Sequence, residues 1–161
     1  MSRKVKRFVW TLILCLSVSC VACADTAYVF CKPDDFVNVR YAPTTNSDAI
    51  GRYECGDSFE TDGVKKKDKK NRTWLHIINA GLEVDDAWIC ASYVQYSPII
   101  IETAYATVVA KGRTAIRKSP NGKVNKWVEN GDDLKIVARS DEWALTDRGC
   151  VSMDCIEVWY E

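Results

Sequence analysis

Short runs of strand-forming residues, separated by turn signals every ten or so positions, follow one another along most of the chain. Trp74–Ile78 and Asp133–Val137 show partial alternation of apolar and polar residues, as expected of strands with one buried face. No window of about eleven residues carries a helical stripe. The other clear runs are Tyr28–Cys31, Val37–Arg40, Ser58–Thr61 and Ala87–Cys90. The pattern predicts an all-β fold.

Four sequence blocks occur twice in the same order, which predicts two copies of one unit, at 28–95 and 105–158. Residues 96–104 are the predicted linker; Pro98 marks a break there, and Ile99–Ile101 leads into the first strand of the second unit. Each unit is small enough to favour a compact barrel, with Trp74 and Trp143 expected in its core rather than at a ligand. The matched blocks are Val39–Pro43 with Ile116–Pro120, Tyr53–Asp57 with Val128–Asp132, Arg72–Leu75 with Asp141–Ala144, and Trp88–Val94 with Cys150–Ile156.

The residues of the first copy resemble the bacterial SH3 domain. The resemblance rests on V-N-V-R-x-x-P in Val37–Pro43, Ile50-Gly51, Gly56-Asp57, W-L-x-I in Trp74–Ile77, and W-I-x-x-x-Y-V in Trp88–Val94. It implies tandem, partly open SH3-like barrels of five or six strands that serve as binding modules of exported proteins, some of which recognise cell-wall peptides or glycans. The second copy departs from the pattern because Cys150 and Cys155 stand in the places of Trp88 and Tyr93.

The N-terminus has the three parts of a secretory signal peptide, predicted to span residues 1–24. A basic cluster, Arg3 to Arg7, precedes a short apolar run, and Ala22-Cys23-Ala24 supplies the small residues of a cleavage site. Two alternatives stay open. The segment could be an uncleaved anchor, or a lipid could be attached at Cys20 or Cys23. We therefore expect a secreted or periplasmic protein, free or lipid-anchored to the cell envelope.

The charge of the exported part argues against nucleic acid as a partner. Without residues 1–24 the chain keeps 18 basic and 22 acidic residues, a formal net charge of −4. Nucleic-acid binding depends on neutralising phosphates with Lys and Arg, so an acidic chain is a poor candidate.

Five cysteines lie in the body of the chain: Cys31, Cys55, Cys90, Cys150 and Cys155. An oxidising compartment permits disulfides, but an odd number leaves at least one thiol free or paired outside the body. Cys150 and Cys155 form a candidate disulfide if the last turn brings their Cα atoms within about 7 Å.

No arrangement of residues predicts catalysis, a cofactor or a bound metal. His76 is the only histidine, and it lies two positions after Trp74, so both side chains are expected on one face of a strand. A Cys–His hydrolase remains a formal alternative. Motifs with zinc-ligand, calcium-loop or phosphate-loop spacing are missing. We expect a non-enzymatic protein.

A ligand site is predicted at one end of the first unit, from the loop before the V-N-V-R block and the aromatic residues near it. Aromatic rings beside carboxylates suit an extended peptide or a cationic group. The expected ligand is cell-wall peptide or glycan, or an envelope protein. The alternative is a structural protein that docks a partner through a sheet edge or a free cysteine. The basic block 65–72 is expected to be a solvated hairpin tip. The candidate ligand-binding residues are Asp34, Asp35, Phe36, Tyr41, Trp88 and Tyr93.

Overall fold

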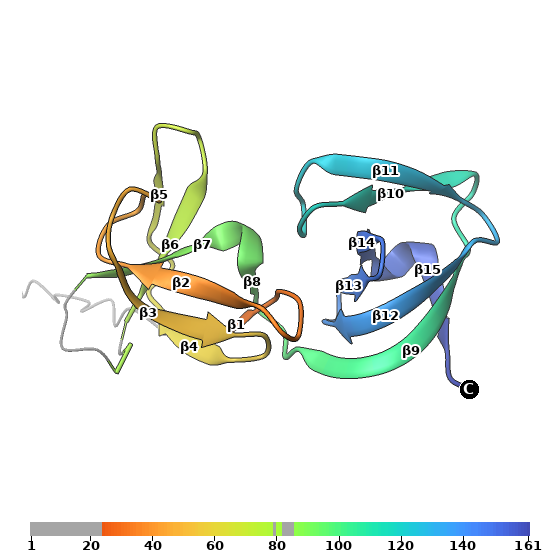
Figure 1. Ribbon diagram of the computed structural model, residues 1–161, viewed down its shortest axis with the longest axis horizontal. Helices are drawn as coiled ribbons and strands as arrows, with labels where there is room; N and C mark the ends of the chain where they lie inside the picture. The colour runs from red at the N-terminus through yellow and green to blue at the C-terminus, as the bar shows by residue number, and fades with distance from the viewer. Residues whose placement is uncertain (1–23, 79, 82–85) are drawn as a thin grey trace, which may run out of the picture.

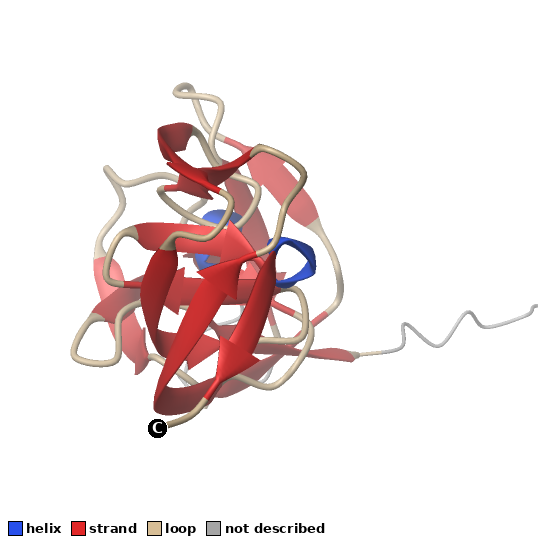
Figure 2. Cartoon of the chain, turned by 90° about the vertical axis from the view of Figure 1, so that its right-hand side faces the viewer, coloured by secondary structure: helices blue, strands red, loops and turns tan. Residues whose placement is uncertain are grey.

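The structure, a computed structural model, describes residues 24–78, 80, 81 and 86–161. Residues 1–23 of the predicted signal peptide, with Cys20 and Cys23, lie outside the described residues. The described chain consists of strands, loops and two short 3₁₀ turns (Figures 1 and 2). The prediction of an all-β fold is therefore confirmed.

The described residues of the first half form eight strands joined by turns and loops (Figure 1). A 3₁₀ turn, η1, precedes the last of them. The elements are β1 (Asp25–Val29), β2 (Phe36–Arg40), β3 (Ala49–Glu54), β4 (Ser58–Thr61), β5 (Lys65–Lys67), β6 (Thr73–Ile77), β7 (Ala87–Cys90), η1 (Ala91–Tyr93) and β8 (Val94–Gln95).

The second half forms seven strands and a second 3₁₀ turn, η2. Its first strand begins inside the predicted linker, because the apolar residues Ile100 and Ile101 already belong to it. The elements are β9 (Ile100–Val108), β10 (Arg113–Arg117), β11 (Val124–Glu129), β12 (Asp133–Arg139), β13 (Trp143–Thr146), β14 (Gly149–Ser152), η2 (Met153–Cys155) and β15 (Ile156–Trp159).

The two halves share one strand order, so the sequence repeat is also a structural repeat. In the first half the antiparallel sheets run β3-β2-β7-β6-β5 and β4-β1-β8. In the second half the equivalent strands run β11-β10-β14-β13 and β12-β9-β15, joined into one sheet by the pairing of β13 with β12. The strand β5 has no counterpart in the second half.

The register matches residue by residue. Arg40 pairs with Trp88 across β2 and β7, and Arg117 pairs with Cys150 across β10 and β14. A bulge interrupts both hairpins at the same place, before Arg40 and before Arg117. The arginine at this bulge donates a hydrogen bond to a carbonyl of the following loop, from Arg40 to Ser47 and from Arg117 to Gly122. The arginine of the V-R-x-x-P block thus holds its own loop in both copies.

The turn between the third and fourth strands of each half is also conserved in geometry. Gly56 has φ +90° and Gly131 has φ +89°, a region that favours glycine. Their amides donate to Val29 and Val108, the last residues of β1 and β9. These bonds tie the turn to the first strand, which explains why the G-D pair recurs in the sequence.

Neither half closes into a barrel within the described residues. In the first half β5 occupies the edge of β6 that in the second half pairs with β12. The strand β4 therefore reaches the larger sheet through the bridge between Glu60 and Ile78 and through a bond from the Thr61 hydroxyl to the His76 carbonyl. In the second half β11 and β15 remain the two edges of the sheet. The predicted SH3-like barrels are open sheets in this structure.

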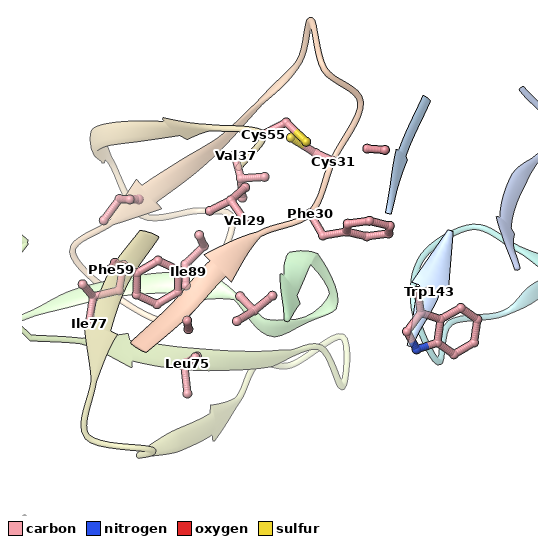
Figure 3. Close-up of a cluster of buried hydrophobic side chains, with 14 of the residues drawn as sticks. Val29, Phe30, Cys31, Val37, Cys55, Phe59, Leu75, Ile77, Ile89 and Trp143 are labelled. Carbon is pink, nitrogen blue, oxygen red and sulfur yellow. The ribbon is translucent and has the colours of Figure 1, made fainter. Parts of the chain in front are cut away.

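Buried side chains gather in two clusters, and the first cluster continues across the boundary between the halves. The second cluster contains only residues of the second half, among them Val108, Ile116 and Val151. The first contains the core of the first half together with Ala138, Trp143, Leu145 and Cys150. Figure 3 shows Phe30 pointing from the first half toward the second. The halves are therefore joined by apolar packing as well as by the chain.

Candidate functional site

The six predicted ligand-binding residues do not form one site. Phe36 and Tyr41 lie at opposite ends of β2, about 16 Å apart at the rise of an extended strand. Trp88 lies in β7 and is only 3% exposed. Asp35 and Tyr93, by contrast, line a common cleft.

That cleft lies between the two halves and has a volume of about 410 Å³. The loop after β1 and the turn η1 form one wall. The loop after β10 and the turn between β13 and β14 form the other. We call it the inter-half cleft. Its lining residues are Phe30, Cys31, Lys32, Asp35, Tyr93, Arg117, Lys118, Ser119, Pro120, Asn125, Leu145, Thr146, Asp147, Arg148, Gly149 and Cys150.

The inter-half cleft has an apolar floor and charged rims. Phe30, Leu145 and Cys150 are buried, whereas Lys32 and Lys118 are exposed on facing walls. The acids Asp35 and Asp147 lie among these cations, and Arg148 lies 4.0 Å from both Asp147 and Asp132. Charges of both signs above an apolar floor can bind a small ligand that carries both an amine and a carboxylate.

Tyr93 supplies the cleft with a neutral phenol. Its side chain is 40% exposed. Burial of the rest, followed by the neighbouring Cys90 and Asp35, raises the pKa of Tyr93 above its ordinary value. The hydroxyl is therefore protonated at neutral pH and can both donate and accept a hydrogen bond.

Trp88 lies in a separate layer on the outer face of β6 and β7. Its ring centroid is 4.9 Å from that of His76, and the Lys66 ammonium lies 4.6 Å from the Trp88 centroid. Trp74, on the same face, donates from Nε1 to Asp68 and lies beneath the Arg72 guanidinium. Side chains of the hairpin that carries β5 thus cover both indoles.

His76 has the predicted orientation, on the same face as Trp74. Its Nδ1 is 2.9 Å from Oδ2 of Asp62, and its Nε2 is 3.8 Å from Oδ1 of Asp86. The thiol of Cys90, on the neighbouring strand, instead contacts the hydroxyl of Ser92 at 3.1 Å. The histidine is thus held between carboxylates and an indole.

The structure does not bring Cys150 and Cys155 together, so the predicted disulfide is absent from it. Cys150 points into the cluster shared by the two halves, whereas Cys155, at the end of η2, packs against the second cluster. Both are free thiols. The physical reason is the alternation along β14, which places Cys150 on the face opposite to Val151.

Asp34, Asp35 and Phe36 line a second, smaller hollow together with Pro33, Arg52 and Glu54. Its volume is about 390 Å³. The Arg52 guanidinium lies 5.1 Å from the centroid of Phe36, and the Asp35 carboxylate accepts a bond from the Phe36 amide. Phe36 and Asp35, which were predicted to contact a ligand, are therefore already engaged in contacts within the protein.

A groove of about 720 Å³ extends from the β5–β6 hairpin to the second half. Four cations line it: Lys65, Lys70 and Arg72 from the hairpin, and Lys123 from the loop after β10. Arg72 is already paired with Asp68 at 2.7 Å. The basic block is therefore partly strand and partly turn, and it faces the other half.

Sequence reasoning missed the second wall of the inter-half cleft. Arg117 and Lys118 line this wall and belong to the repeated V-R-x-x-P block, which predicted the repeat of the fold and no ligand contact. Arg148 lies in a turn with no distinguishing pattern. Only the packing of one half on the other brings these cations opposite Lys32 and Asp35.

The described residues also bear on metal binding and on the crossing of a membrane. No group of three or more His, Cys, Asp or Glu side chains comes together there as metal ligands would. None of the helices in that part of the chain is long and apolar enough to cross a membrane.

Comparisons with known proteins give a weak structural similarity. No protein-family model matches the chain, and no curated protein matches it in sequence. Among solved structures, NlpC2 from Trichomonas vaginalis aligns with a TM-score of 0.33 and 12% identity over 84% of this chain and 48% of that one. NlpC1 from the same organism gives a TM-score of 0.31 and 12% identity over 84% of this chain and 46% of that one. The chain spans about half the length of these two proteins.

Proposed function

We propose that the protein is an exported, non-catalytic binding protein of the bacterial cell envelope and that the inter-half cleft receives a short cell-wall peptide. The observation that carries the proposal is the cleft itself. It joins an apolar floor to cations and acids contributed by both halves. The signal-peptide pattern and the resemblance to bacterial SH3 domains support the envelope as its place of action.

The size and charge of the cleft fit a peptide of a few residues. A volume of about 410 Å³ lies within the range of small-molecule sites. The ammonium groups of Lys32 and Lys118 are placed to meet peptide carboxylates, and Asp35 is placed to meet an amine. Tyr93, which is 40% exposed, offers ring surface to a ligand, and the buried ring of Phe30 lies in the floor of the cleft.

A sedimentation assay with purified peptidoglycan tests the proposal. The variant Lys32→Glu/Lys118→Glu reverses both facing charges, and Lys126→Glu, on the exposed edge strand β11, is the matched control. We expect the double variant to bind about tenfold more weakly, equivalent to about 1.4 kcal/mol, and the control to bind like the unchanged protein.

Two results would contradict the proposal. Failure of the unchanged protein to sediment with peptidoglycan at low salt would exclude the wall as its ligand. Equal binding by the double variant and the control would exclude the inter-half cleft as the site. Competition with soluble stem peptides then separates recognition of peptide from recognition of glycan.

A further inference from the structure

Two cysteines of the first half lie side by side inside its core. Cys31 follows β1, and Cys55 lies in the turn between β3 and β4. The Val29 amide donates to Asp57, and the Gly56 amide donates back to Val29, so the two segments are fixed next to each other. Figure 3 shows the two sulfur atoms adjacent, and the Cys31 thiol donates a hydrogen bond to the Asp35 carbonyl at 3.5 Å.

We propose that Cys31 and Cys55 form a disulfide in the exported protein. Residues facing each other on hydrogen-bonded antiparallel segments have Cα atoms about 4.5–5.5 Å apart, within the range that a disulfide spans. Both side chains are buried, with exposed fractions of 7% and 8%, and belong to one apolar cluster. Continued past the ends of the strands, the register of β1 and β4 puts Cys31 opposite Cys55, so we expect the bond to form with little movement of either segment.

The reaction is thiol–disulfide exchange with a disulfide oxidant, such as glutathione disulfide or a disulfide-carrying oxidoreductase. One cysteine thiolate attacks a sulfur of the oxidant and releases the first thiol. The second cysteine thiolate attacks the mixed disulfide, forms the Cys31–Cys55 bond and releases the second thiol. Two S–H bonds of the protein are lost, and the oxidant gains the two electrons and two protons.

The folded core determines when the bond forms. Burial, and then the neighbouring Cys55 and Asp35, raise the pKa of Cys31 to about 12, and burial also raises the pKa of Cys55. Thiolate is scarce in the folded chain at neutral pH, so exchange is fast only while the segments are still exposed. We expect oxidation during folding and a bond that is shielded from reductants afterwards.

Of the other described thiols, Cys150 shares the first cluster with Cys31 and Cys55 and lines the inter-half cleft with Cys31, so it is the competing partner that the test must distinguish. The remaining two are held elsewhere. Cys90 contacts Ser92, and Cys155 packs against the second cluster. In the second half Ala110 and Asn130 stand at the places of Cys31 and Cys55, because Gly131 and Val108 repeat the bonds of Gly56 and Val29. The disulfide thus belongs to the first half alone, where it would fix the loop that presents Lys32 and Asp35 to the inter-half cleft.

Peptide mapping of the full chain, refolded in a glutathione redox buffer, tests the proposal independently of any ligand. After alkylation under denaturing, non-reducing conditions, trypsin separates the peptide that ends at Arg40 from the peptide that begins at Tyr53. In the full chain the first of these peptides also contains Cys15, Cys20 and Cys23, so fragmentation of the joined species is needed to locate the bond at Cys31. We expect one species that joins these two peptides, lighter than their sum by two hydrogen atoms, and its disappearance on reduction. Of the five described cysteines, Cys90, Cys150 and Cys155 should be alkylated.

Two variants sharpen the result. Cys90→Ser is the control and should leave the joined peptides unchanged. Cys55→Ser should free Cys31 for alkylation; if that variant does not fold, the map of the unchanged chain still decides. Alkylation of both Cys31 and Cys55 in the refolded protein would overturn the proposal, as would a bond from either of them to another cysteine.

Discussion

At the scale of single residues, Asp68 organises the hairpin that covers the outer face of the first half. Its carboxylate accepts bonds from the amides of Lys70 and Arg72, from the Arg72 guanidinium and from the Trp74 indole. Desolvation opposes ionisation of this carboxyl, but the hydrogen bonds, with those of Arg72 first, lower the pKa of Asp68 to about 2.

This lowered pKa makes the stability of the hairpin depend on pH. The carboxylate contributes stability above its ordinary pKa, near 4, and the contribution is lost as the pH falls toward about 2. Asp68→Asn removes the charge and should lower the melting temperature at pH 6 while flattening the change between pH 4 and 2. Thermal unfolding followed by circular dichroism at several pH values measures both effects. If the melting temperature of the variant changes with pH as steeply as that of the unchanged protein, the Asp68 carboxylate is not the group responsible.

A second residue-scale feature is a cation–π pair that recurs with its partners exchanged. In the first half the Arg52 guanidinium lies 5.1 Å from the ring centroid of Phe36, diagonally across the hairpin. In the second half Arg113 occupies the position equivalent to Phe36, and Trp127 the position equivalent to Arg52. There the guanidinium lies 4.6 Å from the ring centroid of Trp127. Both pairs lie on exposed hairpins, β2–β3 and β10–β11.

We expect each pair to be coupled by about 0.5–1 kcal/mol, the usual range for exposed cation–π contacts. Double-mutant cycles with alanine at Phe36 and Arg52, and separately at Arg113 and Trp127, measure the coupling through urea unfolding. A coupling energy indistinguishable from zero in both cycles would mean that the rings merely lie near the guanidinium groups.

At the scale of strands, the close approach of β14 to β10 depends on Gly149. Its φ is +129°, and a Cβ there would lie 2.7 Å from the Arg117 carbonyl oxygen and 2.7 Å from Cγ2 of Ile116. Both contacts are made with a strand that forms one wall of the inter-half cleft, so the glycine also sets the shape of the cleft.

Gly149→Ala should be destabilised by backbone strain of about 1–3 kcal/mol and further by separation of the two strands. Gly131→Ala is the matched control, since it has φ +89° with nothing within 4 Å of its Cβ. We expect Gly149→Ala to lose clearly more free energy of unfolding than the control, measured by urea titration. Equal losses of unfolding free energy in the two variants would show that β10 can move to accommodate the added methyl group.

Strand positions were largely predictable from sequence, because alternation and the repeated blocks depend on local chemistry. The run Val37–Arg40 lies within β2, and the repeated G-D pair forms the turn tied to Val29 and Val108. The outer positions of Trp74 and Trp143 were not predictable. Both are buried, as expected, with exposed fractions of 2% and 8%, but the alternation of β6 and β13 turns them away from the core of their own unit, because Leu75 and Ala144 take the inward positions.

At the scale of the whole molecule, the candidate site exists only because the halves pack together. Asp35 and Tyr93 were predicted from the first copy, but the cations opposite them come from the second copy, whose aromatic positions are occupied by cysteine. A sequence pattern read within one unit carries no information on which of its faces meets the other unit. The fold class was therefore predictable and the cleft was not.

Trp143 is the largest side chain at this junction, and its truncation tests the coupling of the halves. It is 8% exposed and belongs to the cluster of the first half. We expect the unchanged chain to unfold in one transition, and Trp143→Ala to lose about 3–5 kcal/mol of unfolding free energy and to unfold in two transitions. Trp127→Ala, on an exposed strand, should cost no more than about 1 kcal/mol. A single transition with little loss in the Trp143 variant would show that the halves do not depend on this contact.

The hairpin that carries β5 covers the face of the first half on which a further unit could otherwise pack. The outer face of β13 and β14 is buried against the first half, whereas the same face of β6 and β7 is capped by Lys66, Asp68 and Arg72. At the far end, Val109, at the place of Phe30, is exposed. A variant with residues 64–72 replaced by a short turn would expose the outer face of β6 and β7, which is complementary to the end of the second half that carries Val109. We expect this variant to self-associate into open-ended chains in analytical ultracentrifugation. The unchanged chain should sediment as a discrete species.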